Sequence, residues 1–290
     1  MFKKSFKNCI DFAIVFLLAI ISLKKGGFYK TDSMVVSVSI LIISILYIVY
    51  NYITNNKSQK KFDIVALCLL LLSFCYTLPV VFSNFASLSS SLFEIVRYFC
   101  VYIIYKIVKN SDRKNIYINC IIFITIIQCF IGIDGLACRC LNKLLNIFDS
   151  GYLSIDLTRM SSTIQYANVL AILCAVSLIF VIDKIVKNNK SILYNTLQLL
   201  LAFILFSSLV LTASRSVLVI FTLAFIIYLV KNKKDIIYIL TIGLFQIIEV
   251  IIYTSLVYQY IQQKPYMIYI LFLLSLVINI TISFVILLIK

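Results

Sequence analysis

The chain has 290 residues, of which 63% are hydrophobic and only 13% are charged, and its mean hydropathy is +1.08. Soluble domains carry about 25% charged residues, so this composition excludes an ordinary soluble enzyme and favours a multi-pass membrane protein. The net charge of +15 does not indicate nucleic-acid binding, because the lysines cluster in short segments between apolar runs, where the positive-inside rule places them.

Apolar runs near the length of a bilayer-spanning helix recur along the whole chain. In lipid, only helices or closed barrels satisfy their own backbone polar groups, and these continuous runs lack the alternation of a barrel strand. The sequence therefore predicts an all-α polytopic bundle of about ten transmembrane helices, built as one integral membrane domain over residues 1–290. The predicted spans are 9–23, 34–53, 63–82, 89–108, 116–134, 164–182, 193–212, 215–230, 235–259 and 266–288.

The first predicted span follows Lys3, Lys4 and Lys7, as the apolar core of a signal peptide would. No small-x-small cleavage site follows the apolar run, so we expect an uncleaved transmembrane helix. Asp11 lies near the cytoplasmic end of this helix, and we expect its carboxylate to reach the headgroup region.

Lysine clusters indicate which ends of the predicted helices face the cytoplasm. They follow the second, fourth, sixth and eighth spans and so lie on one side of the membrane, which the positive-inside rule assigns to the cytoplasm. The N-terminus is then cytoplasmic, although Lys24, Lys25 and Lys30 fall on the outer side. The cytoplasmic cations include Lys57, Lys60, Lys61, Lys106, Lys109, Arg113, Lys114, Lys184, Lys187, Lys190, Lys231, Lys233 and Lys234.

Two predicted spans carry acidic side chains at hydrocarbon depth. Glu94 and Arg97 are three residues apart in the fourth span, a spacing that lets them pair on one helix face. Glu249 lies near Gln246 in the ninth span. Because intramembrane ions face the bundle interior, we expect structural roles for these groups, with substrate contact as the alternative.

The longest predicted outer segment runs from residue 135 to residue 163. Within it, Leu141, Leu144, Leu145 and Phe148 form one apolar stripe at helical spacing. The stripe predicts a short helix in the outer membrane interface between spans five and six, or a helix that caps the bundle.

Arg215 lies in the short polar motif L-T-A-S-R-S-V-L at the start of the eighth predicted span. The stretch from Val217 to Val230 reaches about 21 Å as a helix, less than the roughly 30 Å of a bilayer core. If Lys231 marks the cytoplasmic boundary, Arg215 lies at hydrocarbon depth below the outer surface. We therefore expect it to face a polar cavity, with snorkelling to the headgroups as the alternative.

Arg159 begins a second polar motif, R-M-S-S-T-I-Q-Y-A-N-V-L-A, just before the sixth predicted span. Ser161 or Ser162 is a candidate N-cap for that helix, and the free N–H groups of a helix start favour an anion. The alternative is an ordinary loop arginine beside an ordinary cap. If both motifs are functional, Arg159 and Arg215 share one outer pocket.

Together the two motifs resemble the two most recognisable blocks of the O-antigen ligase and O-antigen polymerase family of membrane glycosyltransferases. Those blocks are roughly R-x-x-G-T-F-x-N-P-N-x-L-A and T-G-S-R-G-A, and the resemblance covers residues 159–230. The matching residues are Arg159, Thr163, Asn168, Leu170 and Ala171 in the first block, and Thr212, Ser214 and Arg215 in the second. The differing positions are Ser162, Ile164, Tyr166 and Ala167 in the first block, and Ala213, Ser216 and Val217 in the second.

The resemblance implies a role in cell-surface polysaccharide assembly at a bacterial plasma membrane. The family acts at the outer leaflet on glycans carried by a polyprenyl pyrophosphate, without a metal or other cofactor. Arg159 and Arg215 would then hold the pyrophosphate, with further contacts from Asn168, Ser214 and Thr163. The implied partners are the lipid-linked glycan, the bilayer and other polysaccharide-assembly proteins, and not nucleic acid.

The chain departs from this family at the expected catalytic base. Family ligases use a histidine on a large outer loop after these blocks, whereas this chain has no histidine, which also removes the usual metal ligand. We expect either a C-terminally truncated sequence or a shortened relative without ligase activity. Asp156, three residues before Arg159, is a possible base, although an ion pair would lower its pKa and its basicity.

Two other functions remain open from the sequence. The chief alternative is a transporter or flippase for an anionic or lipid-linked glycan substrate, which would use the same arginines to bind it. The second is a noncatalytic partner in a polysaccharide-assembly complex.

Overall fold

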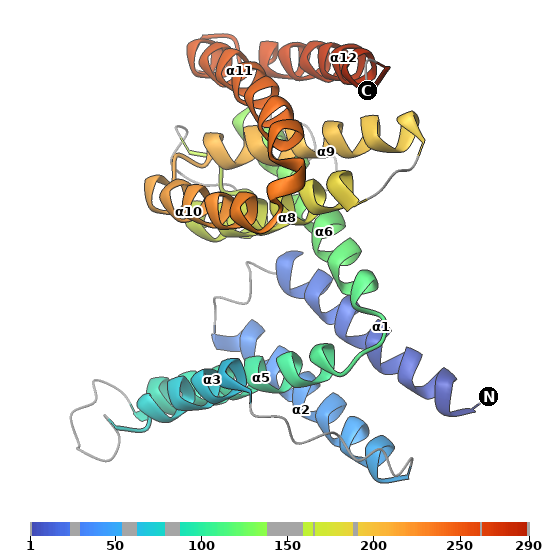
Figure 1. Ribbon diagram of the computed structural model, residues 1–290. Coiled ribbons are helices and arrows are strands. Elements are labelled where there is room, and N and C mark those ends of the chain that lie inside the picture. Colours follow the sequence, from blue (N-terminus) through green and yellow to red (C-terminus); the bar gives the residue numbers. More distant parts are fainter. Residues whose placement is uncertain are drawn as a thin grey trace. The chain divides into compact units, whose positions relative to one another are not determined.

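The computed structural model describes residues 2–23, 30–53, 63–78, 88–137, 159–164, 166–187, 191–261 and 263–288. Every regular element in these ranges is a helix, which confirms the predicted all-α class (Figure 1). Backbone contacts divide the chain into two compact units, Met1–Tyr117 and Ile118–Lys290. We refer to them as unit 1 and unit 2.

The helices lie close to the predicted spans. Their bounds are α1 (Phe2–Leu23), α2 (Lys30–Ile53), α3 (Ile64–Cys75), α5 (Leu88–Lys109), α6 (Lys114–Leu136), α8 (Ala167–Lys187), α9 (Ile192–Leu211), α10 (Arg215–Lys231), α11 (Ile236–Tyr260) and α12 (Met267–Leu288), with short 3-10 turns η2 (Ser162–Ile164) and η3 (Lys233–Asp235). The predicted interfacial helix at 141–148 falls outside the described residues, and so does Asp156.

Within the described residues, six segments are long and apolar enough to cross a membrane, which supports a multi-pass membrane protein but not all ten predicted spans. The largest difference is α3, which ends at Cys75 after 12 residues and so reaches only about 18 Å. The six segments are Met34–Tyr52 in α2, Lys114–Leu136, Ala167–Lys187, Ile192–Leu211, Lys233–Tyr260 around α11, and Met267–Val285 in α12.

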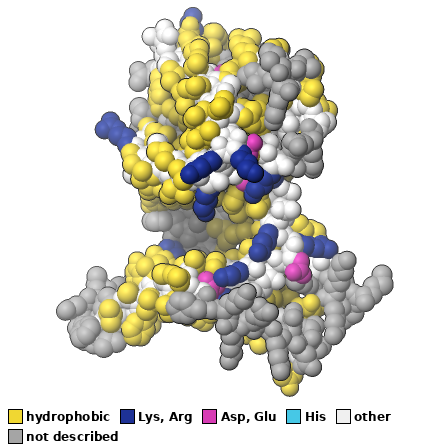
Figure 2. All heavy atoms as spheres, in the orientation of Figure 1, with side chains coloured by type: hydrophobic (Ala, Val, Ile, Leu, Met, Phe, Trp, Pro, Cys, Tyr) yellow, Lys and Arg dark blue, Asp and Glu magenta, His cyan; other side chains and the backbone are white. Residues whose placement is uncertain are grey.

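Large apolar side chains are exposed along the outer faces of these helices, as expected for surfaces that meet lipid (Figure 2). On α10 they include Ile220, Leu223 and Ile227, and on α11 they include Ile248 and Ile251. A soluble protein rarely exposes apolar patches of this extent, so the surface agrees with the composition.

Unit 1 contains α1, α2, α3 and α5 and two polar contacts of interest, one buried and one partly exposed. Asp11 is 3% exposed and accepts hydrogen bonds from the Tyr117 hydroxyl (2.5 Å) and the Ser111 hydroxyl (3.3 Å). The prediction that Asp11 reaches the headgroups is therefore wrong, because two residues remote in sequence supply buried donors. The predicted pair of Glu94 and Arg97 is confirmed, with a closest N–O distance of 3.1 Å.

Asp63 joins the start of α3 to the end of α5. Its carboxylate accepts from the Ala66 N–H (3.3 Å) and from the Tyr105 hydroxyl (3.1 Å), and it pairs with the Lys109 ammonium at 2.7 Å. The bond to Lys109 is the main reason that the pKa of Asp63 falls from 3.8 to about 2, with smaller contributions from Ala66 and Tyr105.

Asp63 should consequently make the stability of the protein depend on pH. Since its pKa is lower in the folded state, the ionised form stabilises the fold fully above the unfolded pKa of about 4, and this contribution disappears as pH falls through about 2. We expect Asp63→Asn, which keeps a good N-cap, to lower the melting temperature of the detergent-solubilised protein at pH 7. The difference from wild type should shrink between pH 4 and pH 2, and a difference independent of pH would contradict the assignment.

Unit 2 contains most of α6 and all of α8 to α12, and its central helix is α9. This helix is apolar nearly all round and packs against α8, α11 and α12. Phe203 of α9 meets Tyr253 of α11 edge-on, with ring centroids 5.7 Å apart. The core formed around α9 fixes the positions of the neighbouring helix ends, which carry the polar motifs.

Candidate functional site

The two arginine motifs contact each other at one end of unit 2. The Met160 N–H donates to the Leu211 carbonyl (3.0 Å), and the Arg159 Nε–H donates to the Thr212 carbonyl (3.0 Å). These bonds join the segment before α8 to the end of α9, across 53 positions of sequence. We call the group Arg159, Asn168, Thr212, Ser214 and Arg215 the arginine site.

Arg159 is half-buried and held in a defined orientation. Besides its bond to Thr212, it donates from Nη2 to Oδ1 of Asn168 at 3.1 Å. Asn168 is the second residue of α8 and is exposed, so the guanidinium lies at the start of this helix. A helix start offers backbone N–H groups without intrahelical partners, and together with a guanidinium it favours an anion.

Arg215 is the first residue of α10 and its side chain is exposed. It follows Thr212 by three positions, so the Cα atoms of Thr212 and Arg215 lie within about 11 Å of each other. Both predicted arginines therefore lie at the same end of unit 2, which we call the arginine end.

Two residues at the arginine end have a left-handed backbone. Ser162 has a φ of 59° and Ala213 has a φ of 50°, a region that side chains with a Cβ rarely adopt. One belongs to each motif, and each turns the chain beside an arginine. Such local strain persists only where the surrounding contacts impose it.

Gln128 of α6 supplies contacts of this kind. It is fully buried, and its Oε1 accepts from the Ser162 hydroxyl (2.5 Å) and the Thr163 hydroxyl (2.7 Å). Thr163 is only 1% exposed, so its hydroxyl holds the segment in place from the interior. The predicted cap by Ser161 or Ser162 is wrong, because α8 begins later, at Ala167.

Two serine hydroxyls of the motifs are buried without a hydrogen-bond partner among the described residues. Ser214 is 2% exposed and precedes Arg215, while Ser161 is 4% exposed and follows Arg159 by two positions. A buried hydroxyl without a partner is costly, so each is available to a bound ligand or water.

Gly132 of α6 packs against the residue that follows Arg159. A Cβ at Gly132 would lie 2.7 Å from Cε and 2.8 Å from Cγ of Met160, whose side chain is 1% exposed and has little room to move. Among the described residues, a Cβ at Gly243 of α11 would have only Phe225 as a close neighbour, at 3.9 Å.

We expect Gly132→Ala to destabilise the protein and Gly243→Ala to leave it as stable as wild type or more stable. Overpacking costs about 1–3 kcal/mol, against a gain of up to about 1 kcal/mol from helix propensity. Thermal unfolding in detergent measures both variants, and adding Met160→Ala to Gly132→Ala should remove the overpacking. Equal stability of the two glycine variants would contradict the packing argument.

Further polar side chains gather at the arginine end. The Tyr269 hydroxyl at the start of α12 donates to Asp134 near the end of α6, and Asp134 is buried. Tyr258, near the end of α11, lies close enough to Arg159 to interact with it electrostatically. Sequence reasoning missed the roles of Gln128, Tyr258 and Tyr269, although a glutamine inside an apolar run is itself a signal of interhelical contact.

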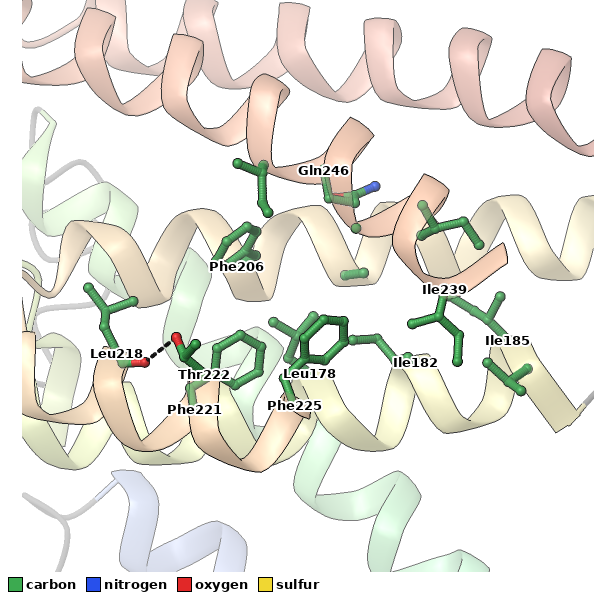
Figure 3. Close-up of a pocket in the computed structure, with 15 residues that line it drawn as sticks. Leu178, Ile182, Ile185, Phe206, Leu218, Phe221, Thr222, Phe225, Ile239 and Gln246 are labelled. Atoms are coloured by element: carbon green, nitrogen blue, oxygen red, sulfur yellow. Dashed lines mark hydrogen bonds between the residues drawn. The ribbon is translucent and has the colours of Figure 1, made fainter. Parts of the chain in front are cut away.

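An apolar groove of about 250 Å³ lies between α8, α9, α10 and α11 (Figure 3). Leu218 and Phe221 of α10 line it, within two turns of Arg215 on the same helix. Its rim residues Thr222 and Ile247 are exposed, so the groove opens to the surroundings of the helices. Among the lining side chains only those of Thr222 and Gln246 are polar.

The described residues contain no group of three His, Cys, Asp or Glu side chains that could hold a metal ion. Comparison of the chain with protein-family models, with curated proteins and with solved structures finds no match.

Proposed function

We propose that this protein acts in cell-surface polysaccharide assembly and binds a polyprenyl-pyrophosphate-linked glycan at the arginine site. The observation that carries the proposal is the contact between the two motifs, in which Arg159 bonds to the Thr212 carbonyl three residues before Arg215. A diphosphate offers several anionic oxygens, and the planar fork of a guanidinium matches them in pairs. Arg159 is the fixed ligand in this arrangement, and Arg215 is the exposed one that closes on the substrate.

The backbone conformation supports the resemblance to the family, from which the proposed substrate is taken. The two family blocks carry glycine at the positions of Ser162, Ala213 and Ser216, and the first two of these are the described non-glycine residues with a left-handed φ, whereas Ser216 is helical. Glycine adopts this conformation without steric cost. A left-handed turn at two positions where the family blocks have glycine is the observation that supports the resemblance.

The apolar groove supports a lipid-linked substrate. It begins within one turn of Arg215 and continues along α10, so a ligand held by its pyrophosphate at the arginine end can lay its hydrocarbon chain against Leu218 and Phe221. An engineered cavity of about 150 Å³ holds benzene, so about 250 Å³ accommodates roughly ten carbon atoms of an isoprenoid chain.

Two guanidiniums also suit the chemistry of glycosyl transfer. When the bond between the anomeric carbon and the pyrophosphate oxygen breaks, negative charge grows on the leaving pyrophosphate, and preorganised cations stabilise it. The reaction further needs a base for the proton of the acceptor hydroxyl. Asp156 stays a prediction for that role.

The proposed topology places the arginine end at the outer face of a bacterial plasma membrane. The opposite ends of α8 and α10 carry Lys184, Lys187 and Lys231, which the positive-inside rule assigns to the cytoplasm. In this arrangement α1, α3, α5 and α10 complete about ten spans and the N-terminus is cytoplasmic.

The length profile of the surface glycan tests this function. A strain that lacks the gene should show a changed profile, and the wild-type gene should restore it, whereas genes with either arginine replaced should not. A flippase would instead leave the lipid-linked glycan on the inner leaflet when the gene is deleted, which labelling of intact cells and inverted vesicles distinguishes. A normal profile from both arginine variants would end the proposal.

A further inference from the structure

Glu249 lies at the middle of α11, a helix long and apolar enough to cross a membrane, and is not part of the arginine site. It is 13 residues after the start of α11 at Ile236 and 11 before its end at Tyr260, or about 20 Å and 17 Å along the helix axis. The side chain is 8% exposed. Intramembrane carboxyl groups at such depth are functional by default, because their ionised form is costly in hydrocarbon.

The neighbours of Glu249 supply one hydrogen bond and no positive charge. The Asn279 amide of α12 donates to Oε2 of Glu249 at 2.6 Å, and the Ser283 hydroxyl donates to Oδ1 of Asn279 at 3.4 Å. Oε1 of Glu249 has no partner among the described residues. The helices α9, α11 and α12 contain no Lys or Arg, and their ionisable groups besides Glu249 are tyrosines: Tyr194, Tyr238, Tyr253, Tyr258, Tyr260 and Tyr269.

Unpartnered oxygens continue along the same face of α11. Gln246, Glu249 and Tyr253 are spaced at i, i+3 and i+7, and each has one buried side-chain oxygen without a partner in the described part of the chain. This face packs on α9, where the Gln246 amide donates to the Leu199 carbonyl at 3.4 Å and Tyr253 meets Phe203. A row of buried oxygens without hydrogen-bond partners is a place where protons or water molecules complete the hydrogen bonding.

We propose that Glu249 is a proton-binding site within the membrane, which carries a proton at neutral pH and exchanges it along the oxygen row of α11. An isolated buried carboxylate avoids its desolvation cost by taking up a proton, and here no cation competes with that proton. The protonated carboxyl keeps the bond from Asn279 at Oε2 and gains a donor at Oε1.

Infrared spectroscopy of the full-length protein in lipid vesicles tests the assignment. The carbonyl stretch of a protonated carboxyl group is separate from carboxylate bands. At pH 7 we expect wild type to show it, with a shift in D₂O, and Glu249→Gln to lose it. Glu94→Gln is the matched control, because the chain has only two glutamates and Glu94 is paired with Arg97 at 3.1 Å. This control should retain the band.

Two results would overturn the proposal. If wild type and Glu249→Gln show the same protonated-carboxyl band at pH 7, or if neither shows one, Glu249 is ionised. Loss of the band on adding Na⁺ at constant pH, but not on adding choline, means that the site takes a metal cation instead. If Glu249→Gln does not fold, carbodiimide labelling of the wild-type protein replaces this variant, because the reagent modifies protonated buried carboxyl groups. We expect the adduct at Glu249. An adduct at Glu94 alone would also overturn the proposal.

Discussion

Replacing Arg159 with alanine is expected to reduce the amount of polymerised or transferred glycan by at least ~100-fold, the usual effect of removing one preorganised donor from a developing negative charge. The variant loses the cation and also the bonds to the Thr212 carbonyl and to Asn168, which align the two motifs. Arg159→Lys keeps the charge but cannot reproduce both bonds, so we expect it to recover only a small part of the activity. Arg215→Ala should be comparably impaired.

The control for this experiment is Arg113→Ala in unit 1. It removes one positive charge from the chain without touching the arginine site, so the glycan profile should stay normal. The amount of protein in the membrane fraction must be equal in all strains. A wild-type profile from Arg159→Ala at equal protein level would remove the pyrophosphate role from this residue.

Replacing Gln128 with leucine is expected to remove most of the activity, although Gln128 is not itself one of the proposed ligands of the substrate. The substitution removes the hydrogen bonds from the buried hydroxyls of Ser162 and Thr163 to Gln128, each of which contributes about 1 kcal/mol. Their loss frees the turn at Ser162, whose left-handed backbone then relaxes and moves Arg159 away from Thr212. We expect a lower melting temperature together with a lower apparent affinity for the lipid-linked substrate.

Gln198→Leu is the matched control for Gln128→Leu. Gln198 is a buried glutamine of α9 whose Oε1 has no hydrogen-bond partner in the described residues, so an apolar replacement should not destabilise the protein. The glycan profile should stay normal in this variant. Equal losses in both variants would show that any buried leucine in the bundle has this effect, and would refute the anchoring role of Gln128.

The positions of the helices could be predicted from the sequence because the position and length of each apolar run set them. Thus α9 was expected at 193–212 and lies at Ile192–Leu211, and α12 was expected at 266–288 and lies at Met267–Leu288. The length of the apolar run did not predict the end of α3, because the run continues beyond Cys75, where the helix ends. An ion pair within one helix could also be predicted, because Glu94 and Arg97 are spaced at i, i+3.

Contacts between distant segments could not be predicted. Asp11 was expected at the headgroups, but its burial depends on donors more than 90 positions away. The cap of α8 was misplaced because Ser162 uses its hydroxyl for Gln128, on another helix. The proximity of Arg159 to Arg215 was expected from a shared membrane face, whereas the atoms that join the two motifs belong to the backbone and leave no trace in side-chain patterns.

The backbone contact between the two motifs has an evolutionary consequence. The motifs are joined through the carbonyl oxygens of Leu211 and Thr212, and every amino acid carries such an oxygen. Mutations can therefore exchange the side chains around this joint while the joint itself persists. Distant descendants of one ancestor would then share a geometry at these two loops long after their aligned letters had diverged beyond recognition.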